Sequence, residues 1–196
     1  MSDFVRQTPV GDNRERSICA SCGHIDYENP KIITGAVVVH DGHVLLCRRA
    51  IAPRIGFWTL PAGYLELGET VEAGACREAY EEAEADIQLD GILAVYSIAR
   101  IGQVQIIFRA RFSGEPAYAA GIESQEVRLF AWDEIPWAEL AFPSVHWSLQ
   151  AWRDSGSGPI GAPQGNPGPT DNGPEPVAPG PYPADSSRDD VIGASA

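Results

Sequence analysis

The sequence lacks three features that would each indicate a class of protein. It has no apolar run near 18 residues, so no segment is expected to cross a membrane. Its 14 basic residues face 27 acidic ones, and without a basic stripe it is not expected to follow the phosphates of a nucleic acid. Residues 1–16 have no hydrophobic core of a signal peptide. We therefore expect a cytoplasmic protein that binds neither membrane nor nucleic acid.

Cysteine and histidine are also scarce, with four residues of each. Cys19 and Cys22 form a C-x-x-C pair, which fits half of a zinc site or a redox pair better than a disulfide framework. Cys47 and Cys76 are expected as small buried side chains, because they lie in an apolar run and in a helical pattern. The histidines show no ligand spacing such as H-E-x-x-H.

The composition divides the chain into three zones. Residues 1–30 are polar and contain the C-x-x-C pair, which predicts an N-terminal arm. Residues 31–152 alternate between strand-like and helical patterns and are expected to form the main domain. Residues 153–196 hold nine of the 16 prolines and eight of the 20 glycines. Such a segment buries too little apolar area to offset its ordering entropy, so we predict that it is disordered.

The middle zone predicts a mixed α/β sandwich. Strands are expected on both sides of a single well-marked helix, with more helix near residue 150. The stretch ETVEAGACREAYEEA (69–83) is the predicted helix, because small apolar residues recur on one face at spacings of four. The predicted strands and helical pieces are a hairpin over 33–49 that turns at Asp41-Gly42, a short strand over 57–63, a hairpin over 91–112 that turns near Ile101-Gly102, a strand over 126–135, and helical pieces over 137–142 and 145–153.

Three glutamates on the predicted helix could form a wetted face or a metal site. Glu78, Glu81 and Glu82 stand at i, i+3 and i+4, so they project from one side. In water such like-charge pairs cost about 0.2–0.5 kcal/mol each, but partly shielded pairs cost about 3 kcal/mol and need a counter-charge. A hard cation such as Mg²⁺ prefers carboxylate oxygens. Helix geometry alone favours the wetted face.

The residues upstream of these glutamates change that balance. From Gly63 to Glu82 the chain reads G-x₅-E-x₇-R-E-A-x-E-E, which resembles the Nudix box. Further stretches are similar to the branch of Nudix hydrolases that contains FAD and ADP-ribose pyrophosphatases and carries an N-terminal zinc-ribbon-like segment, namely YENPKIITG, VLLCRRAI, GFWTLPAGYLELGET, ESQEVRLFAWDEIPW and LAFPSV. The resemblance implies a Nudix α/β/α sandwich of mixed sheet, with the box as a loop–helix–loop.

The resemblance also implies a reaction and its residues. Glu78, Glu81 and Glu82 match the family's metal-binding and catalytic glutamates, the carbonyl of Gly63 often joins them, and Mg²⁺ is the expected cation, with Mn²⁺ as an alternative. Glu69 and Arg77 match the pair that holds the loop onto the helix, and Arg77 is counted as catalytic.

The implied chemistry is hydrolysis of the diphosphate bond in a nucleoside diphosphate linked to another moiety. FAD and ADP-ribose are the first substrates expected, followed by NADH and sugar nucleotides, with release of AMP and a phosphorylated product. A further acid often comes from a later loop in this family. We favour Glu123 over Glu126 for that role, because Glu126 begins a predicted strand.

An anionic substrate also needs cationic and aromatic partners. Among the arginines we expect a phosphate contact from Arg49, Arg54 or Arg100, although each singly fits an ordinary surface arginine. Tyr64 and Tyr96 are candidates to stack on a base or flavin ring, with core packing as the alternative. The four tryptophans after residue 130 are expected to pack under the last helices.

Three further expectations depend on departures from the family pattern. The stretch FVRQTPV stands where relatives carry a first C-x-x-C pair, so we do not expect Zn²⁺ at Cys19 and Cys22, and we expect a degenerate ribbon with a homodimer contact as one role. Glu84 replaces a glycine, and we predict that the helix continues through it without a positive φ. The alternative function is a non-catalytic Nudix-fold protein that binds or senses a nucleotide.

Overall fold

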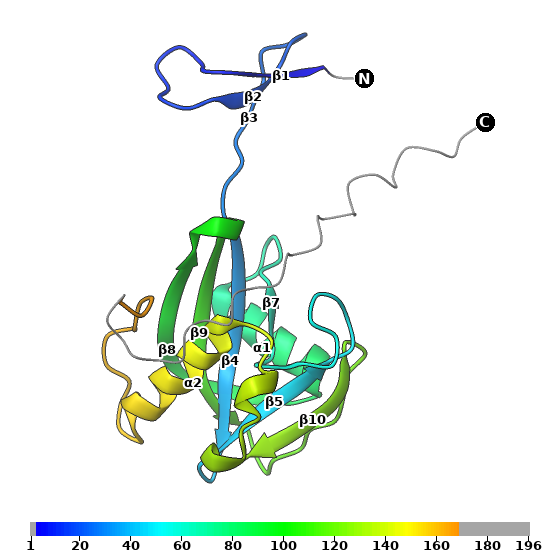
Figure 1. Cartoon of the computed structure of the whole chain (residues 1–196), viewed down its shortest axis with the longest axis vertical. Coiled ribbons are helices and arrows are strands. Elements are labelled where there is room, and N and C mark those ends of the chain that lie inside the picture. The colour runs from blue at the N-terminus through cyan, green and yellow to red at the C-terminus, as the bar shows by residue number, and fades with distance from the viewer. Residues whose placement is uncertain (1–2, 169–196) are drawn as a thin grey trace, which may run out of the picture.

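A small antiparallel sheet precedes the main body of the protein. The computed structural model describes residues 3–168. The small sheet has the order β1-β2-β3 and stands apart from the rest in Figure 1. The side chain of Arg16 holds it, because its Nε donates to Asp12 Oδ2 at 2.9 Å and its guanidinium covers the ring of Tyr27. Its strands are β1 (Phe4–Gln7), β2 (Arg16–Cys19) and β3 (Ile25–Asp26).

The main body is a seven-stranded mixed sheet. Its path is β10-β5-β4-β9-β8, with β6 paired to β5 and β7 paired to β4. Only β4 and β9 run parallel, and the other pairs are antiparallel. The strands are β4 (Lys31–His40), β5 (His43–Arg49), β6 (Trp58–Thr59), β7 (Ala62–Tyr64), β8 (Ile87–Ile98), β9 (Gln103–Phe112) and β10 (Ser124–Phe130). This arrangement confirms the predicted mixed α/β architecture.

The predicted hairpins are present. The β4–β5 hairpin turns at Asp41 and Gly42, which both have positive φ values of 46° and 75°, as a two-residue turn of this hand requires. The β8–β9 hairpin turns through η1 (Ala99–Ile101) and Gly102. The single strand expected over residues 57–63 is wrong. Pro61 breaks the pairing there, so β6 pairs with β5 and β7 pairs with β4.

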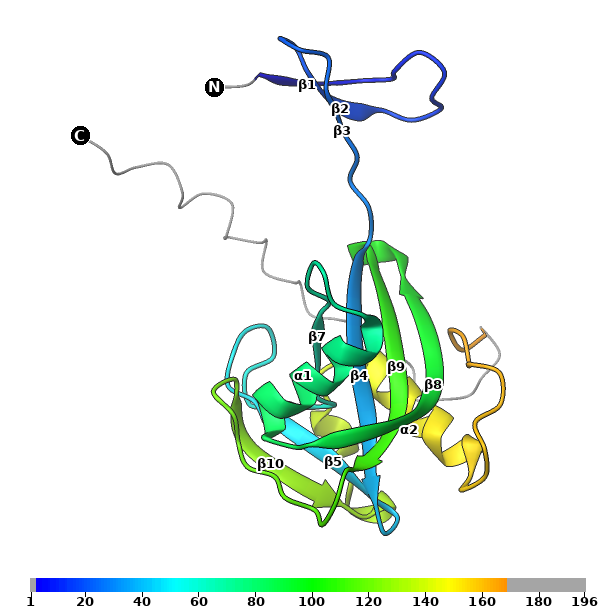
Figure 2. The same ribbon diagram turned by 180° about the vertical axis from the view of Figure 1, so that it is seen from behind.

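Two helices cover opposite faces of the sheet. Figure 1 shows α2 (Pro143–Ser155) in front of the sheet, and Figure 2 shows α1 (Val71–Ala83) on the other side. The α1 face has a core mainly of alanine and aliphatic side chains with Phe108 and Phe112, whereas the α2 face is richer in aromatic ones, tryptophans above all. Two short 3₁₀ segments, η2 (Trp132–Glu134) and η3 (Trp137–Glu139), lead from β10 toward α2.

Helix α1 begins as expected and ends differently. Thr70 caps its N-terminus by accepting from the Ala73 N–H at 3.2 Å. The prediction that the helix continues through Glu84 is wrong, because Glu84 has φ 47° and ψ 28°. The loop from β9 to β10 blocks continuation: the N–H groups of Ala119 and Gly121 donate to the carbonyls of Ala83 and Glu82 at 2.9 and 3.2 Å. Glu84 therefore takes the left-handed cap conformation despite its Cβ.

The prediction of disorder from residue 153 is wrong for residues 153–168. Helix α2 extends to Ser155, and the chain then runs along the edge strand β8. There the backbone of Gln164 exchanges hydrogen bonds with Leu93 and Val95 at 3.0 and 2.8 Å. Composition did not predict this order, because the hydrogen-bond partners of the segment come from the edge of β8 and not from its own residues. Residues 169–196 of the predicted tail lie outside the described residues.

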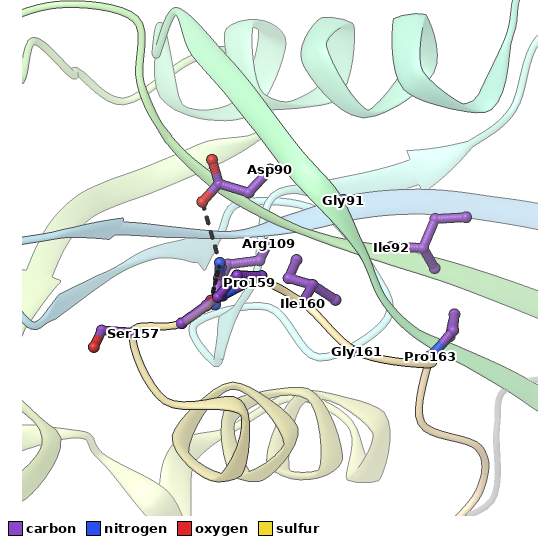
Figure 3. Close-up of a pocket in the computed structure, with 10 residues that line it drawn as sticks. Asp90, Gly91, Ile92, Arg109, Ser157, Pro159, Ile160, Gly161 and Pro163 are labelled. Carbon is purple, nitrogen blue, oxygen red and sulfur yellow. Dashed lines mark hydrogen bonds and ion pairs between the residues drawn. The ribbon is translucent and has the colours of Figure 1, made fainter.

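Arg109 on β9 fastens this segment to the sheet. Figure 3 shows its side chain between Asp90 and the chain that follows α2. The guanidinium donates to Asp90 at 3.3 Å and to the carbonyls of Gly156 and Gly158 at 3.1 and 2.9 Å. A hollow of about 590 Å³ lies between the segment and β8, and no predicted site residue lines it.

The predicted domain boundaries and the predicted cytoplasmic location both stay predictions. The main sheet begins with β4 at Lys31, next to the predicted division at residue 30. Within residues 3–168, no helix combines the length and apolar character needed to cross a membrane.

Candidate functional site

Two carboxylates are buried where α1 meets the sheet. Alanines at positions 75, 79 and 83 are fully buried and bring the helix backbone close to the strands. Glu78 and Glu82 share the inner edge of this face and retain only 8% and 5% exposure. Gly63 on β7 makes room for them, because a Cβ there would overlap the carboxylate of Glu78. The Ala62 N–H donates to Glu82 Oε2 at 3.1 Å.

Arg77 connects the loop before α1 to the acidic face. Its Nε and Nη2 donate to the two carboxylate oxygens of Glu69 at 3.1 and 2.8 Å, a bidentate pair. Its Nη2 also donates to the carbonyl of Tyr64 at 3.0 Å. Its Nη1 donates to Glu78 at 2.7 Å and to Glu81 at 2.9 Å. The predicted contact between Glu69 and Arg77 is therefore present.

The surroundings shift the pKa values of the acids in opposite directions. Hydrogen bonds from Arg77, then from the Glu66 N–H, lower the pKa of Glu69 to about 2. Burial raises the pKa of Glu78, and the opposing effect of Arg77 is smaller. Burial also raises the pKa of Glu82 to about 8, with a further rise from the charge of Glu78. Glu69 is thus a structural anion, whereas for Glu78 and Glu82 the effect of burial exceeds that of the neighbouring arginines.

The donor set around Glu78 and Glu82 fits a hard divalent cation. Both are buried carboxylates, and burial raises the pKa of each more than the neighbouring arginines lower it, so a divalent cation there would find oxygen ligands and stabilise their charged forms. Glu81 differs, because its side chain is 55% exposed and bonded to Arg77. Within residues 3–168 the side chains of His, Cys, Asp and Glu form no group of three close enough to hold a metal ion. The three-glutamate ligand set therefore stays a prediction.

The loop between β9 and β10 supplies a fourth acid to this region. Glu123 lies in that loop just before β10, and its carbonyl accepts from the Ala50 N–H at 2.8 Å. After burial, the charge of Glu123 is among the causes that raise the pKa of both Glu78 and Glu82. Glu126 instead lies on β10 and is 3.9 Å from Arg48. The choice of Glu123 over Glu126 stays a prediction, and these surroundings support it.

The three predicted arginines lie in different surroundings. Arg49 is beside the acidic site, because its charge partly offsets the raised pKa of Glu82, whose main cause is burial. Its Nε donates to the carbonyl of Pro53 at 2.8 Å, and its guanidinium covers the ring of Phe142. Arg54 lies over the ring of Phe57 in the same loop. Arg100 lies in η1, at the turn between β8 and β9.

The two predicted tyrosines have opposite outcomes. Tyr64 follows Gly63, is 48% exposed, and has Lys31 over its ring and Gln103 at its hydroxyl. It stays a candidate for substrate contact. Tyr96 is wrong as a substrate-binding residue, because it is 1% exposed and packs edge-on against Trp147 in the α2-face core. The alternation of β8 points it inward, which the core-packing alternative anticipated.

Two glycines near the site were missed by the sequence analysis. A Cβ at Gly74 would crowd the side chains of Thr34 and Glu69, so this helical glycine lets α1 approach β4. A Cβ at Gly121 would overlap the carbonyl oxygen of Glu81 on α1. Neither has a positive φ, so no turn pattern marks them. The sequence marks them only weakly: Gly74 is a glycine inside a predicted helix, and Gly121 stands two residues before the candidate acid Glu123.

The C-x-x-C pair lies at the end of β2. The Gly23 N–H donates to the Cys19 carbonyl at 2.8 Å, which closes a tight turn around the pair, and Cys19 Sγ is 3.0 Å from Ser21 Oγ. In the described part of the chain no third potential ligand joins them. The stretch FVRQTPV begins with strand β1 rather than a second turn of this kind. Zinc binding is not tested by these contacts.

Comparison with family models identifies both parts of the chain. The model described as NUDIX domain matches residues 30–152, and the zinc-ribbon model described as Nudix N-terminal matches residues 2–28. The first match spans more than half of the 196 residues. The two matches adjoin at the start of β4.

Individual relatives agree with these matches. A MutT-like protein of Streptomyces ambofaciens is 42% identical over 82 residues, which are 42% of this chain and 51% of that protein, so the chain spans about half the length of that relative. An ADP-ribose pyrophosphatase of Methanocaldococcus jannaschii is 31% identical over 120 residues, 59% of this chain and 69% of that protein. The crystal structure of a NUDIX hydrolase from Nitrosomonas europaea superimposes with a TM-score of 0.77 at 42% identity, covering 84% of this chain and 93% of that one.

Proposed function

Because the chain belongs to the Nudix hydrolase family, we propose that it hydrolyses the diphosphate bond of a nucleoside diphosphate linked to another moiety. ADP-ribose is the substrate with the most support, because a relative of 31% identity is named ADP-ribose pyrophosphatase. Water would cleave ADP-ribose to AMP and ribose 5-phosphate. FAD, which would give AMP and FMN, is the second candidate, since it rests on the likeness of sequence stretches alone.

The observation that carries this proposal is the pair of buried carboxylates beside Gly63. Burying Glu78 and Glu82 side by side is costly for a purely structural role, even with Arg77 bonded to Glu78. A site that receives a cation together with a diphosphate accounts for the burial of both acids. A protein that only sensed a nucleotide would not need to retain this arrangement.

We propose Mg²⁺ as the cation, with Glu78 and Glu82 as ligands and Glu81 joining them, and Mn²⁺ as a substitute. When bound, such an ion neutralises diphosphate oxygens and makes a water more acidic. Glu81 can contribute only if its carboxylate leaves Nη1 of Arg77, which it can do because it is more than half exposed. The bond of that same nitrogen to Glu78 keeps Arg77 beside the site.

The remaining residues act on the substrate and the proton. Glu123, in the loop before β10, would accept the proton of the attacking water. Arg49 supplies positive charge near Glu82 and can balance a phosphate. Tyr64 offers an exposed ring one residue beyond Gly63 for a base or a ribose. Arg77, held by Glu69, keeps the loop and helix in register.

The test is a substrate panel with the full chain. ADP-ribose, FAD, NADH and sugar nucleotides are incubated with MgCl₂ or MnCl₂, and AMP and the second product are separated by chromatography. We expect AMP from ADP-ribose, with loss of activity in EDTA and in Glu78→Gln. Glu84→Gln is the matched control, because this exposed acid lies at the end of the same helix. Absence of cleavage of every compound with either metal would reject the proposal.

A further inference from the structure

The loop that carries Glu123 is attached to the helix that carries the other acids. It leaves β9 at Phe112, crosses the C-terminal end of α1 and enters β10 at Ser124. Two of its N–H groups, from Ala119 and Gly121, donate to the last carbonyls of the helix at 2.9 and 3.2 Å. These carbonyls would otherwise lack partners, so the loop caps the helix.

Gly121 is the point of closest approach in this attachment. A Cβ there would overlap the carbonyl oxygen of Glu81 and crowd the carbonyl carbons of Glu81 and Glu82. These are backbone atoms of a helix, which cannot turn aside as a flexible side chain can. The restriction is steric rather than conformational, since Gly121 has no positive φ. Any side chain at this position must separate the loop from the helix.

The loop is also fixed on its other side. The Ser124 N–H donates to the Gly121 carbonyl at 3.0 Å, which forms a tight turn with Ile122 and Glu123 at its centre. The Glu123 carbonyl accepts from the Ala50 N–H at 2.8 Å, and Ser124 then pairs with Arg49 on β5. Glu123 therefore stands in a short turn whose first residue rests on α1 and whose last residue rests on β5.

We propose that Gly121 is a positioning residue that sets the place of Glu123 relative to Glu78 and Glu82. Its missing side chain lets the turn rest on the last turn of α1, so that a residue 40 positions from the helix joins the same site. This inference rests on the proposed function. The residue touches neither substrate nor cation and acts through Glu123.

The decisive experiment is a double-mutant cycle of Gly121→Ala and Glu123→Gln. We expect each single variant to lose about 10- to 100-fold in kcat for ADP-ribose with Mg²⁺, with KM little changed, as for other losses of supporting contacts and of alignment. We expect the double variant to match Glu123→Gln alone, because the glycine has nothing left to position. If Gly121 supported only the fold, the losses of the two single variants would multiply in the double variant.

The matched control is Gly114→Ala in the same loop. A Cβ at Gly114 meets no atom within 4 Å and its φ is not positive, so we expect wild-type kinetics. Ala119→Pro is a second variant in case Gly121→Ala does not fold, because it removes the other N–H of the attachment. Circular dichroism and thermal melting establish that each variant is folded.

A readout without turnover separates this inference from the proposed function. Mn²⁺ affinity, measured by electron paramagnetic resonance of the free ion, is expected to fall by the same factor in Gly121→Ala, Glu123→Gln and the double variant, about 10-fold, because each change removes or displaces a negative charge near the cation's ligands. If the wild type cleaves no substrate, the proposed function fails and the Mn²⁺ cycle still decides the role of Gly121. Wild-type behaviour of Gly121→Ala, no effect of Glu123→Gln, or independent effects in the cycle would each overturn the inference.

Discussion

The helices α1 and α2 have the same length, 13 residues, but they pack on opposite faces of one sheet by different means. α1 buries alanines and a glycine, and beside them two carboxylates. α2 buries Val145 and Leu149 with two serines, and tryptophans surround it. Tyr96 of the sheet packs edge-on against Trp147 of α2.

The two faces contribute different properties: the α1 face carries the acidic site, and the α2 face contributes stability. Small side chains let the backbone of α1 come close to β4 and β7, which brings Glu78 against Gly63 and Glu82 against the Ala62 N–H. That proximity buries charge and lowers the stability of the metal-free protein. The large side chains of the α2 face bury more apolar area and contribute stability without a charged group. Variants on the two faces should therefore have opposite effects on activity and stability.

The largest effect is expected on the α1 face. Glu82→Gln should reduce activity at least about 100-fold, as the loss of groups that stabilise transition-state charge does. The raised pKa of Glu82 means that its folded carboxyl binds a proton more tightly than the unfolded one, so it destabilises the fold as pH rises from 4.5 to about 8. In EDTA, Glu82→Gln should melt higher than wild type at pH 8, with the difference shrinking at pH 4. A lower melting temperature at pH 8 would contradict this.

The opposite pattern is expected on the α2 face. Leu149 is fully buried, and Leu149→Ala should lower the free energy of unfolding by about 2–5 kcal/mol through lost burial and a cavity. Its activity at 20 °C should be little changed, because the acidic site lies on the other face. Urea unfolding and steady-state kinetics measure the two effects. A comparable loss of kcat in the folded variant would show that the faces are coupled.

A smaller stability effect is expected where the chain after α2 meets β8. Arg109→Met removes the hydrogen bonds to Asp90, Gly156 and Gly158, which should cost at least about 1.5–3 kcal/mol, the net value of a single hydrogen bond to a charged group. Amide exchange at Val95 should become faster. Arg128→Met is the control, because Arg128 is exposed and loosely paired with Glu134. Equal losses in both variants would contradict a role in fastening.

The smallest effect is expected at the end of α1. Glu84→Gly relieves the left-handed conformation of a residue with a Cβ and should raise the free energy of unfolding by about 1 kcal/mol. Activity should not change, because the helix end keeps its shape. Thermal melting with Glu84→Ala as comparison measures the gain. Equal stability of the two variants would show that the conformation carries no strain.

Much of the site could be predicted because it lies within one short stretch. The register of Gly63, Glu69, Arg77 and the glutamates of α1 follows from a single loop and helix, whose geometry is local. The bidentate contact of Arg77 with Glu69 and the burial of the alanine face agree with that prediction. The hairpins were predicted for the same reason, since turn residues and alternation act over a few positions.

The errors came from contacts between distant segments. Tyr96 was expected to contact substrate but faces the α2 core, because only the folded sheet decides which side of β8 is covered. Glu84 adopts a positive φ because the loop from β9 crosses its helix. The segment after Ser155 lies along β8 because the edge strand offers it hydrogen bonds. None of these partners is near in sequence.

The sequence by itself determined the family, the mixed α/β architecture and the acidic face of α1, because periodicity and fixed spacing express the geometry of a single helix or hairpin. Only the tertiary structure decided that Glu78 and Glu82 are buried while Glu81 is exposed, and that the backbone of Gly121 lies against the end of α1. The physical reason is that burial and steric contact depend on which surfaces meet across the fold, and no local pattern encodes that meeting.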